Sequence, residues 1–132
     1  GCRKGEILSL RWSQVDLANR IVRLEPGTTK NDHARELPLS PEPYEMLAMQ
    51  KMIRDTFYRD CPWVFFRKGK PIADLRGAWE AACKLVGLAD ADGRPTCIFH
   101  DLRRTGIRNL IRAGIPQNVA MKISGHRTDS VF

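Results

Sequence analysis

The sequence predicts an α+β domain that is mainly helical and carries a small antiparallel hairpin. Apolar residues recur at helical spacing in several separate segments, while branched or alternating apolar residues mark only short segments between them. Glycine or proline stands at most of the predicted boundaries. The chain has 132 residues, of which 42% are hydrophobic, so it is long enough to bury one core and too short for two. We therefore expect a single domain.

The first third of the chain predicts a short helix followed by a hairpin. Residues 6–12 (EILSLRW) have a helix-like pattern, and the branched residues of 21–25 (IVRLE) favour a strand. The alternating leucines of 35–40 (RELPLS) favour a partner strand. Lys30 lies between the two strands, so we expect it near the tip of the hairpin.

The middle third predicts two helices separated by a short strand. Residues 40–60 begin with a serine cap and prolines, and their methionines recur at helical intervals, so we expect these methionines to fill the core. Residues 63–66 (WVFF) favour a strand. Residues 73–88 predict an amphipathic helix that ends at Gly87.

The last third predicts two helices joined by a glycine and proline turn. Apolar residues recur at helical spacing over 100–114, and a glycine ends this pattern. Pro116 is placed to begin the next helix, and Gly125 stands just past its end. His126 is therefore expected on the exit turn.

The charge of the chain favours a polyanionic partner. Lysine and arginine number 22 against 15 acidic residues, which gives a net charge of +7. From His100 to Arg127 there are six lysines and arginines but a single acidic residue, Asp101. This concentration favours nucleic acid as the partner.

One arginine of the helix over 100–114 is predicted to face the core. Arg103 falls among the apolar positions of this helix, whereas Arg104, Arg108 and Arg112 lie together on the opposite face. A guanidinium on the core side needs a carboxylate, carbonyl oxygens or a bound anion, unless it reaches solvent past the end of the helix. The outer three arginines form either a solvated face or a contact with phosphate backbone.

Cysteine usage and hydropathy limit the class of protein. The four cysteines are widely spaced and no secretory segment precedes them, so we expect reduced thiols in a cytoplasmic protein. No apolar run approaches the length of about 20 residues that spans a bilayer, so no membrane contact is expected. Cys97 and His100 have a spacing that zinc accepts, but no second pair of such ligands lies nearby. We expect neither a metal nor another cofactor.

Four segments resemble motifs of the tyrosine recombinase (phage integrase) catalytic domain. Residues 1–17 (GCRKGEILSLRWSQVDL) resemble its first-arginine motif, and 29–40 (TKNDHARELPLS) resemble its lysine-bearing hairpin. Residues 100–105 (HDLRRT) and 114–126 (GIPQNVAMKISGH) resemble its H-x-x-R and G-H motifs. The four occur in the family's order over nearly the whole chain, which makes them specific jointly. The resemblance implies that family's fold, DNA as the partner, and a source in a phage or other mobile element.

The resemblance also implies active-site roles for Arg3, Lys30, His100, Arg103 and His126. The two arginines would clamp the scissile phosphate, and His126 would donate to a nonbridging oxygen. Lys30 would protonate the leaving 5′ oxygen, and His100 would assist proton movement at the nucleophile. A tyrosine would attack phosphorus to form a 3′-phosphotyrosyl link without metal or cofactor. The residue types suit this chemistry, because arginine binds phosphate through two N–H groups and histidine exchanges protons near neutrality.

The residues taken one at a time also allow ordinary structural roles. Lys30 would be an exposed hairpin lysine, and His126 would cap the last carbonyls of a helix. Arg3 would form a surface ion pair with Glu6, worth under about 1 kcal/mol, and Glu6 is assigned a structural role.

The chain as a whole has an alternative function, that of a non-catalytic nucleic-acid-binding module. Residues 114–129 would then act like a helix-turn-helix reader. A basic face would hold backbone phosphate in either case, and its residues are Arg104, Arg108, Arg112 and Arg127.

The sequence departs from the family's pattern at the nucleophile. The family's tyrosine follows the G-H motif by several residues, whereas the two tyrosines here, Tyr44 and Tyr58, both lie in 40–60. We therefore expect residues 1–132 to be a partial catalytic domain that lacks its first segment, its C-terminal tyrosine segment and a separate N-terminal DNA-binding domain. Such a piece is expected to be inactive in cleavage, and the full-length protein is expected to work as an oligomer on DNA.

Overall fold

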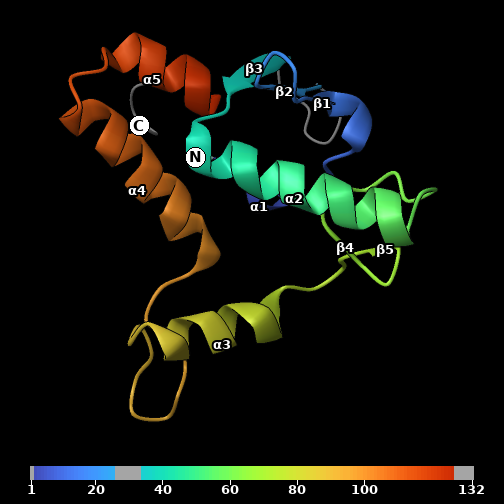
Figure 1. Cartoon of the computed structure of the whole chain (residues 1–132). Coiled ribbons are helices and arrows are strands. Elements are labelled where there is room, and N and C mark those ends of the chain that lie inside the picture. Colours follow the sequence, from blue (N-terminus) through green and yellow to red (C-terminus); the bar gives the residue numbers. More distant parts are fainter. Residues whose placement is uncertain (1, 26–33, 127–132) are drawn as a thin grey trace.

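The computed structural model describes residues 2–25 and 34–126 of the chain. Its fold is α+β and mainly helical, as predicted (Figure 1). In chain order the elements are α1 (Lys4–Leu8), the 3₁₀ helix η1 (Trp12–Gln14), β1 (Val15–Asp16), β2 (Ile21–Leu24), β3 (Arg35–Pro38), α2 (Pro41–Phe57), β4 (Phe66–Arg67), β5 (Lys70–Pro71), α3 (Arg76–Leu85), α4 (Phe99–Arg112) and α5 (Gln117–Ser124).

The predicted hairpin is present as part of a three-stranded antiparallel sheet in the order β1-β2-β3. Val22 of β2 lies opposite Leu37 of β3 and opposite Val15 of β1. The strand β1 is an addition to the predicted hairpin. Residues 26–33, with Lys30, lie outside the described part of the chain.

The main core lies between this sheet, α2 and the segment that follows α2. Its buried side chains are Leu10, Val22, Leu24, Leu47 and Val64. The backbone ties the segment after α2 to the start of the chain, because Val64 N–H donates to Leu10 O at 2.9 Å and Trp12 N–H donates to Pro62 O at 3.0 Å. The predicted strand over 63–66 is therefore reduced to a bridge between Trp63 and Arg11, followed by the small β4–β5 hairpin.

The expectation that the methionines of α2 fill the core is wrong. Met46, Met49 and Met52 are 57%, 62% and 64% exposed, and within α2, whose residues are all described, only Leu47 is buried. The reason is geometric: the sheet covers one side of the helix, and the apolar stripe of the sequence is wider than that side.

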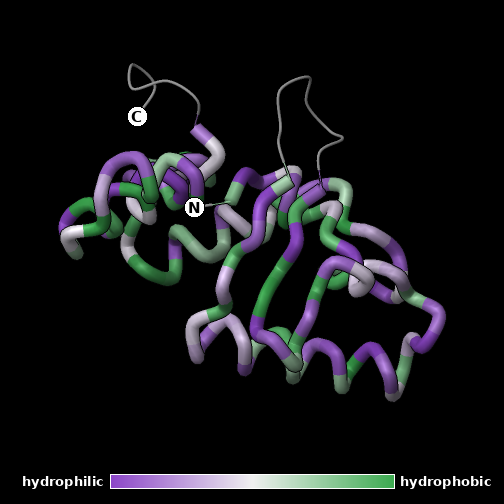
Figure 2. The backbone as a smooth tube through the Cα atoms, turned by 90° about the horizontal axis from the view of Figure 1, so that it is seen from above, coloured by the Kyte–Doolittle hydropathy of each residue, from purple (hydrophilic) through white to green (hydrophobic). Residues whose placement is uncertain are grey.

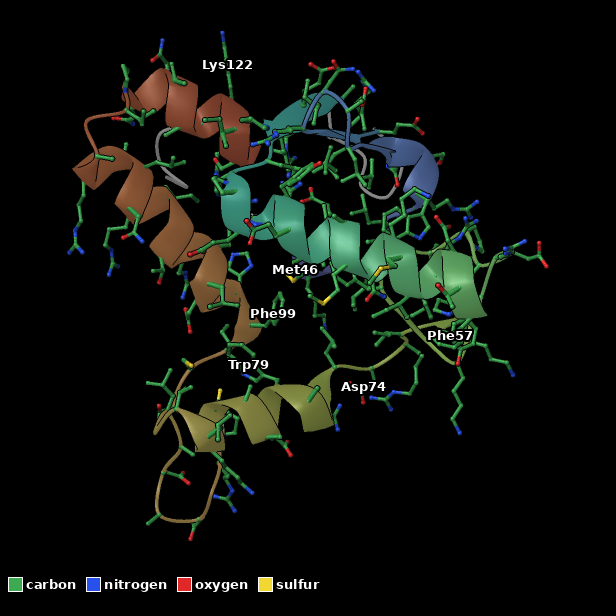
Figure 3. The ribbon with its side chains drawn as sticks, viewed as in Figure 1. Met46, Phe57, Asp74, Trp79, Phe99 and Lys122 are labelled. Carbon is green, nitrogen blue, oxygen red and sulfur yellow. The ribbon has the colours of Figure 1, made fainter. Side chains whose placement is uncertain are left out.

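The helix α3 packs against the beginning of α4. The Trp79 ring meets the Phe99 ring edge to face with centroids 5.3 Å apart, and Trp79 Nε1 donates to Cys97 O at 3.1 Å. Figure 3 shows Trp79 and Phe99 facing each other across these two elements, with Met46 on the side of α2 that is turned toward them in this view. All four cysteines are free thiols.

The helices α4 and α5 form a pair that lies beside the sheet and α2, as the view from above shows (Figure 2). The turn that follows α4 contains Gly114, whose φ of 79° lies in the left-handed region. The end of α5 lies next to β3 (Figure 1), so the last described residues approach the first arginine of the chain and the base of the hairpin. None of the described helices is both long and apolar enough to cross a membrane.

Candidate active site

Arg103 points inward from the first turns of α4, as its position in the sequence predicts. The Asp101 carboxylate accepts the Ile98 N–H at 2.9 Å, which fixes the start of the helix one turn before Arg103. The Arg103 side chain crosses to the end of α5, where Nη2 donates to Ser124 O at 2.5 Å, and the residue is 3% exposed. The route past the helix end to solvent is therefore not taken. The charge of Arg103 meets the negative, carbonyl end of α5 instead.

The end of α5 is shaped by Gly125. Its φ of 72° lies in the left-handed region, and the turn is closed by three backbone bonds: Gly125 N–H to Met121 O at 2.7 Å and to Lys122 O at 3.3 Å, and His126 N–H to Met121 O at 3.0 Å. A side chain at Gly125 would also collide with the guanidinium of Arg35. This turn brings the His126 ring against Arg103, with Nη2 3.3 Å from Nδ1 and 3.4 Å from Nε2.

Arg3 reaches the same place from the other end of the chain. Its Nη2 donates to Gly125 O at 3.4 Å, next to the carbonyl that holds Arg103. The fold thus brings Arg3 and Arg103, which are far apart in sequence, to neighbouring carbonyl oxygens.

The ion pair between Arg3 and Glu6 is also present, and it belongs to a larger cluster. Glu6 accepts Arg3 Nη1 at 3.0 Å and the Arg3 backbone N–H at 2.7 Å, and its other partner is Arg35 Nη2 at 2.7 Å. The Glu6 and Arg35 side chains are each only 9% exposed, so this is not the surface pair that the residues alone suggest. Glu6 has the structural role assigned to it: it holds two arginines beside the end of α5.

Arg35 is the residue that sequence reasoning missed. It sits in β3 as one of several exposed-looking charges on a short strand, and nothing local marks it. The signal that points to Arg35 is indirect. Glu6 lies between several cations, and identifying them requires the position of each cation in the fold. Within the described residues, the buried Nε of Arg35 has no hydrogen-bond partner.

The site carries more positive than negative charge. Burial lowers the pKa of Arg103, and the nearby charge of Arg3 lowers it further. Burial likewise lowers the pKa of His126, with Arg103 and Arg3 as the next causes. His126 is therefore a neutral imidazole near pH 7, and an anion placed here would be attracted by the surrounding arginines.

A pocket of about 640 Å³ opens between α4 and α5 beside these groups. It is lined by His100, Arg103, Arg104, Ile107, Arg108, Ile111, Gln117 and His126. His100 is exposed at its rim, and Arg104 pairs with Asp101 at 2.8 Å. Arg112 is exposed and lies further along α4. Lys30 and Arg127 fall outside the described residues.

Neither tyrosine of the sequence is shown at this site. Tyr44 lies under the Arg20 guanidinium at 4.5 Å from the ring centroid, and Tyr58 packs edge-on against Phe66 at 5.1 Å. In the described part of the chain, no group of three or more histidine, cysteine, aspartate or glutamate residues is arranged to hold a metal.

Known proteins resemble the chain in sequence and in fold. The chain is 28% identical to the integrase of Salmonella phage P22 over 95% of its length, and 30% identical to a shufflon-specific DNA recombinase of Escherichia coli over 96%. It covers 33% and 29% of those proteins, so it spans about a third of the length of the curated relatives it matches.

Two solved structures share the fold. The XerA recombinase superposes with a TM-score of 0.75 at 22% identity, covering 98% of this chain and 45% of that one. The Tn1549 transposon integrase, solved in complex with transposon right end DNA, gives 0.71 at 20% identity, covering 98% of this chain and 48% of the other. The profile of the phage integrase family matches residues 1–131. Since that match takes in nearly the whole chain, including Arg3, Arg35 and Arg103, this protein is a member of the phage integrase family.

Proposed function

We propose that this chain forms the phosphate-binding part of the catalytic domain of a site-specific tyrosine recombinase, which cleaves and rejoins DNA through a 3′-phosphotyrosyl intermediate. The observation that carries the proposal is the meeting of Arg3 and Arg103 at neighbouring carbonyls of one helix end, beside His126. The names of the relatives, an integrase and a DNA recombinase, support the same activity.

In this proposal the two guanidinium groups bind the nonbridging oxygens of the scissile phosphate. Each arginine donates through one nitrogen to a carbonyl of the α5 end, which fixes the side chain at the site. Donors held in place before the substrate arrives stabilise the charge of the transition state without reorganisation. The loss of one such donor commonly costs about a hundredfold to a thousandfold in rate.

The proton-transfer roles rest on the family resemblance and on position. His100 stands at the pocket rim one turn before Arg103, where it can exchange a proton with a nucleophile that enters the pocket. Lys30 is proposed as the general acid for the leaving 5′ oxygen. His126 donates a hydrogen bond to the phosphate.

The exposed arginines of α4 provide the contact with the rest of the DNA. Arg104, Arg108 and Arg112 are exposed along one helix, and we assign them, with Arg127, to the phosphate backbone. Such contacts position the duplex without reading its sequence. The full-length protein is proposed to act as an oligomer on DNA in the cytoplasm.

The nucleophile is not assigned to either tyrosine of these 132 residues. Tyr44 and Tyr58 are used in packing, so we propose that this polypeptide binds the phosphate without becoming linked to it. A denaturing gel after incubation with a nicked duplex tests this, and a strand that migrates with the protein would contradict it.

The alternative of a non-catalytic DNA-binding module gives no reason for the burial of Arg103. Binding to backbone phosphate requires exposed cations, whereas Arg103 is 3% exposed and held beside a histidine.

The binding of inorganic sulfate, measured by calorimetry, tests the proposal. Arg103→Lys and Arg3→Lys keep the charge and remove the forked donor, so each is expected to weaken sulfate binding about tenfold. Arg112→Lys, a change of the same kind on an exposed arginine outside the pocket lining, is the matched control and should leave the affinity unchanged. Equal affinity in all three variants would overturn the assignment of the site.

A further inference from the structure

Ser124 contacts both of the groups that converge at the end of α5. It is 1% exposed, its carbonyl oxygen accepts Arg103 Nη2 at 2.5 Å, and its Oγ lies 2.7 Å from His126 Nδ1. A buried hydroxyl at this distance from a ring nitrogen is in a position to decide which nitrogen carries the imidazole proton.

The direction of this hydrogen bond follows from the neighbouring carbonyl. Among the described residues, Ser124 Oγ has one other acceptor within reach, Met121 O, at 3.2 Å. That oxygen already accepts the Gly125 N–H at 2.7 Å and the His126 N–H at 3.0 Å, so both of its lone pairs are in use. Hydroxyl hydrogen bonds are shortest and strongest near 2.7 to 2.8 Å, roughly the Oγ to Nδ1 distance. The shorter contact and the crowded carbonyl favour donation of the hydroxyl proton to Nδ1 over donation to Met121 O.

We propose that Ser124 is a positioning residue that keeps the proton of neutral His126 on Nε2, the nitrogen with which His126 donates to a bound phosphoryl oxygen. The consequence for phosphate binding rests on the proposed function of this site, whereas the position of the proton rests on the contacts of Ser124 and His126. When Nδ1 accepts from Ser124, the neutral ring has its N–H on Nε2. Ser124 Oγ contacts Nδ1 at 2.7 Å, which leaves Nε2 as the nitrogen that carries the proton, and His126 is one of the residues that line the pocket.

The contact with Arg103 does not fix this proton. Its Nη2 lies at nearly the same distance from both ring nitrogens, 3.3 and 3.4 Å, so it selects neither. The charge state makes the tautomer important, because a neutral imidazole has a single N–H to donate, whereas an imidazolium has one on each nitrogen. Without the serine hydroxyl, part of the population would turn an unprotonated nitrogen toward the anion.

The proton position is measured by nitrogen NMR of the His126 ring in the 132-residue chain above the pKa of that ring. We expect the Nε2–H tautomer in the wild type and a mixture of tautomers in Ser124→Ala. Ser124→Cys keeps a weak donor and should lie between them. Ser9→Ala is the matched control, because the Ser9 hydroxyl donates to a helix carbonyl, Gly5 O at 2.8 Å, and has no histidine as a partner within the described part of the chain. A wild-type ring with its proton on Nδ1, or an unchanged tautomer in both Ser124 variants, would overturn the proposal.

Sulfate affinity across pH gives a second readout that a purely structural role would not produce. At high pH, Ser124→Ala should bind sulfate more weakly than the wild type in proportion to the fraction of rings without a proton on Nε2, about twofold for an equal mixture of tautomers. At low pH the deficit should disappear, since the imidazolium carries both protons in either protein. A deficit of the same size at every pH would contradict the positioning role. If the wild type binds no sulfate, the proposed function fails, while the NMR measurement still decides the role of Ser124.

Discussion

Replacing Glu6 by glutamine tests whether the arginines that Glu6 contacts, Arg3 and Arg35, need its negative charge. Glutamine has nearly the same shape and keeps one carbonyl oxygen, so the change removes the negative charge and little else. Glu6 is 9% exposed and contacts Arg35, also 9% exposed, at 2.7 Å and Arg3, 34% exposed, at 3.0 Å. The variant therefore leaves several cations close together with no carboxylate between them.

The size of the effect follows from the exposure of each partner. Removing one partner of a buried ion pair costs about 3 to 5 kcal/mol, while a solvated pair contributes at most about 1 kcal/mol. Because glutamine still accepts one hydrogen bond, we expect Glu6→Gln to lower the free energy of unfolding by about 3 kcal/mol. For a domain of this size that corresponds to a fall in Tm of roughly 10 °C.

Thermal unfolding followed by circular dichroism, with and without sulfate, measures both parts of this prediction. Sulfate should raise the Tm of Glu6→Gln more than that of the wild type, because the anion replaces the missing charge and stabilises the folded state by binding it. Sodium chloride at equal ionic strength controls for screening. Glu36→Gln is the matched variant, since the 61% exposed Glu36 pairs with Arg23 on the sheet surface and should cost less than about 1 kcal/mol. Equal losses in the two variants, or no extra response to sulfate, would refute the reasoning.

Three further predictions concern stability. The pKa of His126 is lowered in the folded state, so the unfolded chain binds a proton on this ring more readily. The contribution of neutral His126 to stability is therefore complete above the unfolded pKa of about 6.5 and is lost as pH falls below it. Denaturant titrations of His126→Asn should accordingly show a flatter dependence of stability on pH. Gly125→Ala should lower the free energy of unfolding more than Gly87→Ala. Both glycines have a positive φ, of 72° and 74°, but of the two only Gly125 lies where a Cβ would meet another group of the described residues. Equal unfolding midpoints of the two variants in urea would disprove this. Val64→Ala removes part of a fully buried side chain and should lower the free energy of unfolding by about 2 kcal/mol. Met49→Gln changes a side chain that is 62% exposed and should alter stability by less than about 0.5 kcal/mol. A large loss for Met49→Gln in chemical denaturation would show that this face of α2 is covered.

The parts of the fold that were predictable from sequence are those with a local cause. The inward direction of Arg103 follows from helical periodicity alone, and the turn that carries His126 follows from a glycine after an apolar run. The pairing of β2 with β3 follows from the alternating leucines of the second strand. In each case the residues that decide the structure lie within one or two turns of each other.

The parts that were not predictable depend on which element lies across from a residue. Arg35 belongs to the site because α5 ends next to β3, and no pattern within β3 contains that information. Met46 and Met49 have helical spacing, but the sheet covers only the side of α2 that carries Leu47. The partner of Arg103 was expected to be an anion or a carboxylate as readily as a carbonyl, and only the fold selects Ser124 O.

The use of main-chain oxygens to hold Arg3 and Arg103 has a consequence for how this protein family diversifies. Every amino acid supplies the same carbonyl group, so exposed positions along α5 are free to change without disturbing the anchorage of either arginine, provided that the helix still ends at Gly125. Selection on those outer positions, such as the exposed Lys122, can then alter surface properties while the chemistry beneath stays constant.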